Sequence, residues 1–316
     1  MRVTDSLMSQ SFLRNLNAST NNMMKYQKQL ATLKEVSKPS DDPLRVSKIL
    51  DLNNTIVQTD QYKTTINDSI QWTNVQDSAL SSATKSLQRI KTLIQASAND
   101  TLNHSDRQAQ KIEVEAEISG FVDALNTNFG GRYIFGGINT TEVPFEVDKD
   151  AAGEITGIIY NGTVPDVSGT ASNISSNLTR EIAPGVSIEL NTDGNVFMNE
   201  KGTTGSPDNI STFFTDVLQA LESDDTEKLS GLLGRADQQL DNVVANRSKV
   251  GSIFNRLEAT LERNASEQLN LKTMLSENQD IDLAEKYMEF TMENTAYQAS
   301  LSMGTKILQT NILDYL

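Results

Sequence analysis

Three pairs of closely spaced aspartates are the residues of this chain whose spacing could support chemistry. They are Asp41/Asp42, Asp148/Asp150 and Asp280/Asp282. Two neighbouring carboxylates can act as acid and base in hydrolysis, or bind a divalent cation through their oxygens. Each pair, however, stands where a helix should begin or the chain should turn, and aspartate is favoured there because it accepts hydrogen bonds from backbone amides. No EF-hand spacing surrounds any pair, so we expect no metal site.

Other reactive side chains are scarce. The chain has no cysteine and one histidine, His104, which we place in a solvated turn before a helix. A histidine without a second histidine or a cysteine to partner it is a poor candidate for catalysis or zinc binding. The sequence contains no nucleophile elbow, zinc signature, dinucleotide fingerprint or phosphate-binding loop. We therefore predict that the protein is not an enzyme and that it has no catalytic, cofactor-binding or metal-binding residues.

The amino-acid composition limits the kinds of partner that this protein can bind. The chain of 316 residues carries 27 Lys and Arg against 42 Asp and Glu, a net charge of -15, so nucleic acid would be repelled over most of the surface. The first ten residues lack the apolar region of a secretory signal, and no run of about 18 apolar residues exists that could span a membrane. We expect neither nucleic-acid nor membrane binding, and export, if it occurs, without a cleavable signal.

The segment 281–316 should form a long helix with apolar residues on more than one face. A seam with the three- and four-residue steps of a coiled coil contains Leu283, Tyr287, Phe290, Asn294, Tyr297, Leu301, Gly304, Leu308, Asn311 and Tyr315. A second row contains Ala296, Ala299, Met303 and Ile307. Asp280 and Asp282 are candidates for the N-cap, and Glu285 would close a capping box with Asp282. A helix with several apolar faces favours self-association, although burial in a folded bundle explains the same periodicity.

The N-terminal residues 1–37 show a weaker seam of the same kind. It contains Phe12, Leu16, Ser19, Met23, Tyr26, Leu30 and Leu33. Two such helices at opposite ends of one chain can pair with each other, which would bring the termini together. We therefore predict an assembly interface on both ends, formed by Phe12, Leu16, Met23, Tyr26, Leu30, Leu283, Tyr287, Phe290, Tyr297, Leu301, Met303, Ile307, Leu308 and Ile312.

The segments between the ends read mostly as helices. Pro39 and Asp42-Pro43 break one helix and start the next, because proline suits the first helical position and Asp42 the N-cap. Helices are expected over 43–98, 105–129, 210–221 and 226–278, with a capping box at Ser105-Asp106-Arg107-Gln108 opening the second of them. Arg247, Asn264 and Gln268 interrupt the apolar seam of the last helix; such residues either fix register or lie at the rim of a wider bundle.

The period changes at residues 128–137, where paired glycines flank Arg132 to Phe135. This pattern predicts the end of a helix, a short strand and a tight turn. Residues 154–160 and 186–190 are strand-prone, and Asp193-Gly194 before Val196 indicates a hairpin. The fold class is thus mainly α with a β-rich insert: terminal assembly helices at 1–42 and 279–316, a helical core bundle at 43–137 and 206–278, and an inserted β-rich domain at 138–205. Both chain ends would form a long antiparallel bundle or coiled coil.

With these residues laid out, the chain resembles the flagellin superfamily over about 1–137 and 210–316. The motifs are Met1-Arg2-Val3-Thr4, Lys38-Pro39-Ser40-Asp41-Asp42-Pro43, Gly131-Arg132-Tyr133-Ile134-Phe135-Gly136-Gly137, Arg247-Ser248-Lys249-Val250-Gly251 running to Asn255-Arg256-Leu257-Glu258, and the closing Asp282 to Leu316. Within the superfamily the second and third motifs are similar to those of the proteins that join hook to filament. Filament flagellins usually show an alanine-rich Asp-Asp-Ala-Ala restart instead.

The resemblance implies a structural protein that is exported unfolded through the flagellar type III apparatus and ends in the extracellular flagellum. It implies four partners: copies of the chain itself in a ring, the hook-side junction protein, flagellin and an export chaperone. Two alternatives stay open at this point. One is a filament flagellin, and the other, of a different class, is a soluble coiled-coil sensor or adapter whose β insert binds a ligand.

Overall fold

A computed structural model describes residues 2–36, 38–99, 102–137, 139–150, 153–161, 177–190, 192–198 and 209–313 of the chain. The chain divides into two compact units: unit 1 contains residues 1–60 and 266–316, and unit 2 contains residues 61–265. Two long helices, α2 (Pro43–Ser97) and α6 (Thr226–Gln279), each contribute to both units. Helices dominate, as the sequence predicts, and none in the described part of the chain has the length and apolar character needed to cross a membrane.

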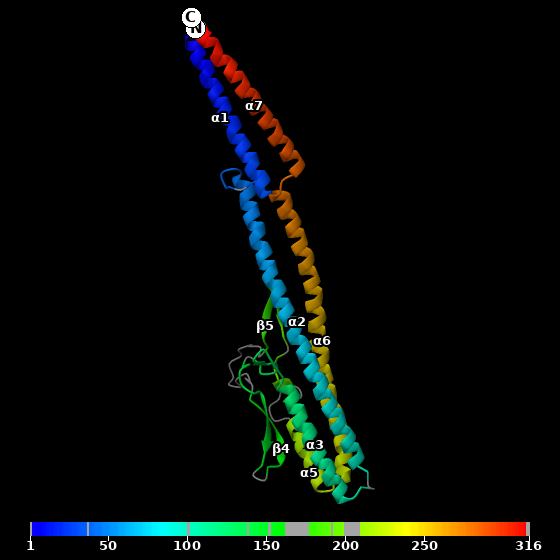
Figure 1. The fold of residues 1–316 in the computed structure, drawn as a ribbon. Coiled ribbons are helices and arrows are strands. Elements are labelled where there is room, and N and C mark those ends of the chain that lie inside the picture. The colour runs from blue at the N-terminus through cyan, green and yellow to red at the C-terminus, as the bar shows by residue number, and fades with distance from the viewer. Residues whose placement is uncertain are drawn as a thin grey trace. The chain divides into compact units, whose positions relative to one another are not determined.

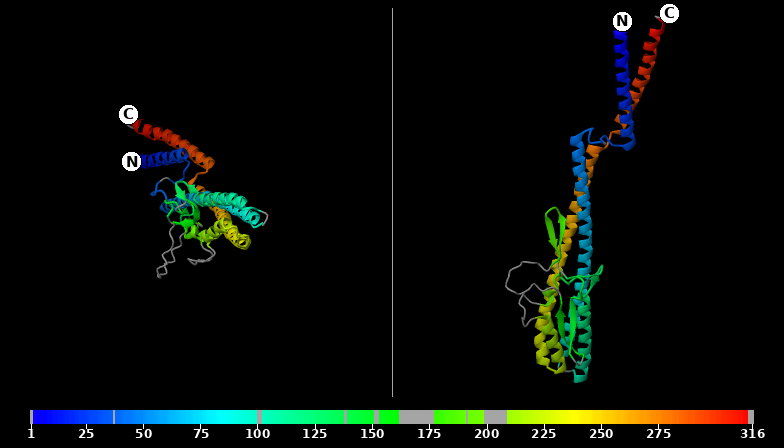
Figure 2. Two further views of the ribbon diagram at one scale, coloured as in Figure 1. Left: turned by 90° about the horizontal axis from the view of Figure 1, so that it is seen from below. Right: turned by 90° about the vertical axis from the view of Figure 1, so that its left-hand side faces the viewer.

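Unit 1 consists of four helical segments. Helix α1 (Arg2–Thr32) and helix α7 (Leu283–Leu313) pack along each other, and the first turns of α1 lie beside the last turns of α7 (Figures 1 and 2). The predicted antiparallel pairing of the two chain ends is therefore confirmed. Helix α1 stops because Leu33 adopts a left-handed φ of 57°, and α2 restarts at Pro43, where the amide of Arg45 donates to Oδ1 of Asp42 at 3.0 Å.

Unit 2 is a bundle in which the remainders of α2 and α6 run antiparallel, joined by α3 (His104–Leu125) and α5 (Ile210–Glu222). The bidentate ion pair between Arg247 of α6 and Asp77 of α2, at 2.7 and 3.0 Å, ties the two long helices together. Figure 1 shows α3 and α5 beside these helices. The apolar face of α5 is almost entirely buried, which explains why so short a helix holds its place.

The start of α3 differs from the prediction. Its N-cap is Asn103, whose side chain accepts from the amide of Asp106 at 2.9 Å while the Asp106 carboxylate accepts from the amide of Asn103. The predicted capping box at Ser105 is therefore wrong by two residues, because the side chain of Asn103 already accepts a hydrogen bond from a free amide of the first turn. His104 is consequently the first residue of the helix and not part of a turn before it. The helix also ends at Leu125, four residues before the predicted Phe129.

Three antiparallel hairpins make up the β structure. They are β1 (Asn128–Phe129) with β2 (Arg132–Tyr133), β3 (Phe145–Lys149) with β4 (Ile155–Tyr160), and β5 (Thr179–Ala183) with β6 (Val186–Glu189). The first hairpin turns at Gly130 and Gly131, which both have positive φ, as the paired glycines predict. The predicted hairpin at Asp193-Gly194 is wrong. Asp193 accepts from the amide of Asn195 at 2.9 Å and so opens a short helix, α4 (Asn195–Met198).

The main hydrophobic cluster of unit 2 receives side chains from both helices and hairpins, and a smaller one joins the β5-β6 hairpin to α2 and α6. The largest fully buried side chains of the main cluster include Phe121, Phe145, Phe213 and Phe214. Phe121 and Phe214 meet edge to face with centroids 5.7 Å apart, which joins α3 to α5. The β3-β4 hairpin is therefore not an appendage, because Phe145 of its first strand is part of the same core as the helices.

The predicted seam of α6 is confirmed. Its apolar members are buried or half-buried from Leu229 to Leu275. The three polar interruptions behave differently from one another: Arg247 lies at the rim and pairs with Asp77, Gln268 is half-buried and donates to Asp60 at 3.2 Å, and Asn264 is only 6% exposed. The rim explanation thus holds for the first two residues and fails for Asn264.

Candidate assembly surface

The contact between α1 and α7 is the first part of the predicted interface. Five α1 residues of the predicted seam are half-buried and are spaced by three, four or seven residues: Phe12, Leu16, Met23, Tyr26 and Leu30. From α7, Phe290 and Tyr297 are half-buried and Gly304 is buried. A Cβ at Gly304 would lie 2.9 Å from Cε1 of Phe12, so the two helices approach closely only because position 304 has no side chain.

The other predicted α7 residues do not face α1. Leu283, Tyr287 and Met303 are 57–65% exposed and Leu301 is 43% exposed. That Leu283, Tyr287 and Leu301 form an assembly interface stays a prediction. On the face of α7 that meets α1, the position is taken by Lys286. Its ammonium lies 5.9 Å from the centroid of the Tyr26 ring and 2.9 Å from Glu289. Ile307, Leu308 and Ile312 fall within α7, but their side chains lie outside the described residues.

Exposed apolar side chains are concentrated in unit 1. On the terminal pair, the name used here for α1 and α7, they are Leu7, Met8, Leu13, Met24, Leu283, Tyr287, Met288, Met292, Leu301 and Met303. More follow on the unit 1 parts of α2 and α6: Leu44, Leu50, Val57, Leu269 and Met274. We call these residues the outward apolar set. Exposed apolar side chains in this number, in a chain of net charge -15, are typical of a surface that meets another protein.

A shallow groove lies within this surface on α7. It is lined by Thr291, Met292, Thr295, Ala296 and Ala299. Two of these residues belong to the predicted second row, and small side chains at this spacing let another backbone approach. The outward face of α7 thus offers both protruding methionines and a hollow between them.

By contrast, unit 1 buries few apolar side chains. Only Val36, Ile49 and Leu52 are buried apolar residues in its described part, and every other buried apolar side chain in the described ranges belongs to unit 2. Burial of apolar surface contributes about 25 cal/mol per Å², and it must offset a conformational entropy of about 1–2 kcal/mol per ordered residue. Unit 1 therefore has a much weaker hydrophobic core than unit 2.

The aspartate pairs serve as caps and turns. Asp42 caps α2, and Asp282 caps α7 by accepting from the amides of Ala284 and Glu285 at 2.9 and 3.2 Å. Asp280 does not cap α7; its backbone pairs with Lys34 and its carboxylate accepts from the hydroxyl of Ser276. Among the residues that the structure describes, no three acidic, histidine or cysteine side chains gather where they could hold a metal ion.

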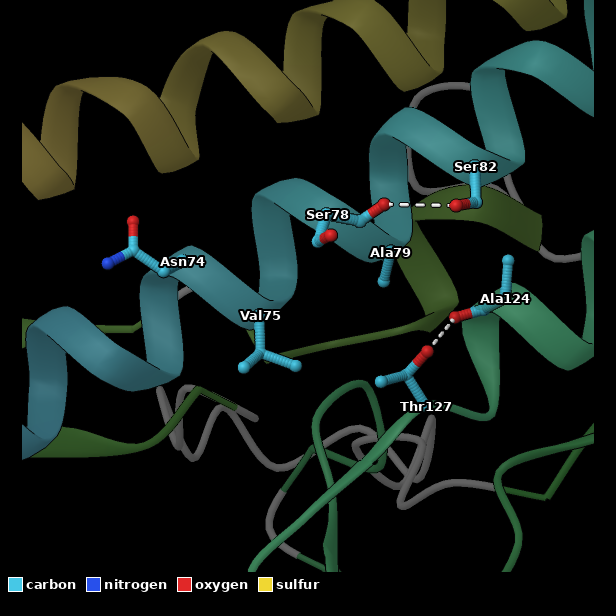
Figure 3. A pocket seen from close by; sticks show the side chains of 7 residues that line it. All are labelled: Asn74, Val75, Ser78, Ala79, Ser82, Ala124 and Thr127. Carbon is cyan, nitrogen blue, oxygen red and sulfur yellow. Dashed lines mark hydrogen bonds between the residues drawn. The ribbon is translucent and has the colours of Figure 1, made fainter.

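A pocket in unit 2 also lacks reactive groups. It lies between α2 and the end of α3 and is lined by Asn74, Val75, Ser78, Ala79, Ser82, Ala124 and Thr127 (Figure 3). The hydroxyls of Ser82 and Thr127 donate to the carbonyls of Ser78 and Ala124, so both are engaged in helix hydrogen bonds. His104 lies elsewhere, with Nδ1 2.6 Å from Oδ2 of Asp224.

The turn at residues 131–137 is part of the unit 2 core. Ile134 and Phe135 are fully buried, and the Phe135 ring meets Phe197 edge to face at 5.4 Å. The hydroxyl of Tyr160 donates to the Phe135 carbonyl at 3.3 Å, and the amide of Gly194 donates to that hydroxyl at 3.2 Å. Burial, followed by the nearby Asp193 carboxylate, raises the pKa of Tyr160 above its ordinary value. The motif therefore contributes to the packing of the unit 2 core.

Family models match both halves of this architecture. The bacterial flagellin N-terminal helical region matches residues 3–140, and the bacterial flagellin C-terminal helical region matches residues 233–316. The chain belongs to the flagellin family. Together the two matches include the terminal pair, both long helices, α3 and the turn at 131–137, whereas the flagellin models leave the β3-β6 hairpins unmatched.

Within the flagellin family, several relatives match along almost their full length. Flagellar hook-associated protein 3 of Escherichia coli (strain K12) is 26% identical over 96% of this chain and 96% of its own. Among solved structures, a putative flagellar hook-associated protein from Vibrio parahaemolyticus superposes with a TM-score of 0.64, at 18% identity over 76% of this chain and 100% of its own. The flagellar junction protein FlgL from Legionella pneumophila gives 0.55, at 15% identity over 74% and 100%. The two structures establish the shared fold.

Sequence reasoning missed the polar contacts at the base of the terminal pair. Arg45 and Lys286 both reach Glu35, at 3.0 and 3.8 Å. The sequence does place a charged residue beside each helix break, which could have indicated these contacts. Hydrophobic periodicity, however, predicts that charged residues face solvent, and their partners are not neighbours in sequence.

Proposed function

We propose that this protein is a structural component of the bacterial flagellum, placed at the junction between hook and filament, where it forms a ring on which flagellin polymerises. The observation that supports this most is the 26% identity to flagellar hook-associated protein 3 across 96% of both chains. The junction-type motifs at 38–43 and 131–137 support the same choice over a filament flagellin.

The imbalance between the two units supplies a mechanism for assembly. Unit 2 has its own core, whereas the described part of unit 1 has three buried apolar residues and the outward apolar set. A segment of this kind gains most of its stability when a neighbouring molecule covers it, so ordering and binding become coupled. Subunits would then become fully ordered only at the growing tip. The same weak packing suits export of the unfolded chain.

The proposed partners follow from this mechanism. They are further copies of the chain in a ring, the hook-side junction protein, flagellin on the distal side and a chaperone that covers the ends before export. The final location would be the extracellular flagellum. We assign the intermolecular contacts to the predicted interface residues that are exposed, namely Leu283, Tyr287, Leu301 and Met303, together with the rest of the outward apolar set.

Deletion of the gene tests the junction role directly. Cells would be examined by electron microscopy, and flagellin in the medium would be measured. We expect hooks without filaments and flagellin monomers shed into the medium. Normal filaments would overturn the proposal. Loss of filaments without shed flagellin would instead identify the protein as the filament subunit.

Limited proteolysis with mass spectrometry tests the coupled ordering. In the free protein, cleavage should occur first in the outer turns of α1 and α7 and later, or not at all, in unit 2. Equal resistance of residues 1–37, 281–316 and 61–265 would contradict assembly through the ends and would favour a soluble adapter.

A further inference from the structure

One residue, Glu35, contacts all four helices of unit 1 at the place where two of them begin and two end. Its amide donates to the carbonyl of Gln279 at the end of α6 (2.8 Å), and its carbonyl accepts from Nε2 of Gln29 in α1 (2.6 Å). Its carboxylate accepts from Arg45 in α2 at 3.0 Å and lies 3.8 Å from Nζ of Lys286 in α7.

The surroundings make these contacts stronger than ordinary surface ion pairs. The side chains of Glu35, Arg45 and Lys286 are 34%, 27% and 15% exposed, so each charge is partly shielded from solvent. The hydrogen bond that Lys286 donates to the Glu289 carboxylate, followed by the charges of Glu289, Glu35 and Glu285, raises the pKa of Lys286, which keeps its ammonium protonated. Nε of Arg45 also donates to the carbonyl of Asn278 at 2.6 Å.

Both helix breaks of unit 1 lie at this point. The chain leaves α1 through Leu33, which has a positive φ, and enters α7 through residues 280–282. The two breaks are held together by backbone pairing of Lys34 with Asp280 and by the amide of Ile281 donating to Leu33 at 3.3 Å. Backbone pairing of two short segments fixes their separation. It does not fix the direction in which the helices leave, because the φ and ψ angles on either side remain free to rotate.

We infer that Glu35 is a positioning residue that fixes the direction in which the terminal pair leaves α2 and α6. The Glu35 carboxylate is bound by Arg45 of α2 and by Lys286 of α7. The backbone of Glu35 is hydrogen-bonded to α1 and to α6. The inference goes beyond the junction role, and only its consequence for assembly depends on that role. A fixed direction would present the outward apolar set of all four helices to a neighbour as one surface.

A pair of spin labels on the full chain tests this inference. The chain has no cysteine, so Leu269→Cys on α6 and Met292→Cys on α7 provide the only thiols, and both positions are more than half exposed. We expect one narrow distance distribution between the labels in the parent protein. Glu35→Gln keeps the size and the backbone contacts of the residue but removes both ion pairs, so the single narrow peak should be lost.

The matched control is Glu289→Gln, which removes a carboxylate that pairs with the same lysine from within α7; its distribution should stay narrow. Fluorescence of the only tryptophan, Trp72 in unit 2, reports whether each variant keeps its core. A broad distribution in the parent, an unchanged distribution in Glu35→Gln, or equal broadening in the control would overturn the inference. None of these results would change the interpretation of the deletion experiment, which tests the junction role alone.

Discussion

Gly304 of α7 lies against the ring of Phe12 of α1, with room for a hydrogen but not for a methyl group. A glycine inside a helix normally lowers helix stability by about 1 kcal/mol relative to alanine. Its presence here is therefore explained by the packing against Phe12 and not by helix propensity.

Replacing Gly304 with alanine should for this reason not bring the usual gain. The new methyl group would displace the Phe12 ring, and overpacking of this kind costs about 1–3 kcal/mol. Gly234→Ala is the matched control, because Gly234 lies within α6 and a Cβ there meets nothing within 4 Å. Hydrogen exchange of the α1 and α7 amides measures the effect of Gly304→Ala on the stability of these two helices. Thermal unfolding measures the effect of Gly234→Ala. If Gly304→Ala strengthens α1 protection as much as Gly234→Ala stabilises α6, the contact does not limit the approach of the helices.

Leu301→Asp should separate folding from assembly. Leu301 is 43% exposed in the free protein, so the change should alter its stability by no more than about 0.5 kcal/mol. In the assembled state the new carboxylate would be buried without a partner, at a cost of several kcal/mol, or at least about a tenfold loss of incorporation. Immunoblots of flagella and of the medium measure that loss. Val244→Asp in α6, equally exposed at 43%, should incorporate normally. Equal incorporation of both variants would exclude Leu301 from the interface.

Phe135→Ala should destabilise unit 2 strongly. The ring is fully buried against Phe197, and deleting a buried phenylalanine side chain costs about 3–5 kcal/mol. Urea unfolding followed by the fluorescence of Trp72 measures this, because that residue lies in the same hydrophobic cluster. Tyr133→Ala, in the same turn but half-buried, should cost clearly less. A similar loss for both variants would mean that the turn, and not the ring, carries the stability.

Tyr160→Phe should make stability less sensitive to alkaline pH. The pKa of Tyr160 is raised in the folded protein, so above its unfolded value of about 10 the unfolded chain releases a proton that the folded protein retains. This stability is fully present below pH 10 and is lost as pH rises further. The phenylalanine variant lacks this proton and should lose less between pH 10 and pH 11, measured by urea unfolding at each pH. Parallel pH profiles of parent and variant would show that the hydroxyl ionises equally in both states.

Much of the helical framework could be predicted from local signals. The predicted helices 43–98, 210–221 and 226–278 correspond to Pro43–Ser97, Ile210–Glu222 and Thr226–Gln279. Asp42 and Pro43 fix the first boundary by capping chemistry that depends only on neighbouring residues. Periodicity likewise identified the α1 face from Phe12 to Leu30.

The contact face of α7 could not be predicted in the same way. Tyr287 and Leu301 are more apolar than Lys286, so a pattern of hydrophobic residues places them inside. The structure instead uses Lys286, because its ammonium lies over the Tyr26 ring of α1 and its charge reaches Glu35 and Glu289. The error at Asp193-Gly194 has a similar origin: the side chain of Asp193 forms a local hydrogen bond that starts a helix where the dipeptide alone indicates a hairpin. Both features depend on side-chain partners that no single-sequence pattern specifies.

The continuity of α2 and α6 through both units has a kinetic consequence. Starting a helix is unfavourable, with a nucleation constant of about 10⁻³, whereas each further residue adds to an existing helix at little cost. The unit 2 portions of α2 and α6 are held by tertiary packing, so their unit 1 portions can grow outward from ends that already exist. Helices α1 and α7 begin beyond chain breaks and must each nucleate anew. The positions of the two breaks therefore determine the order in which the helices form. Helices α1 and α7 should be the last to form and the first to melt.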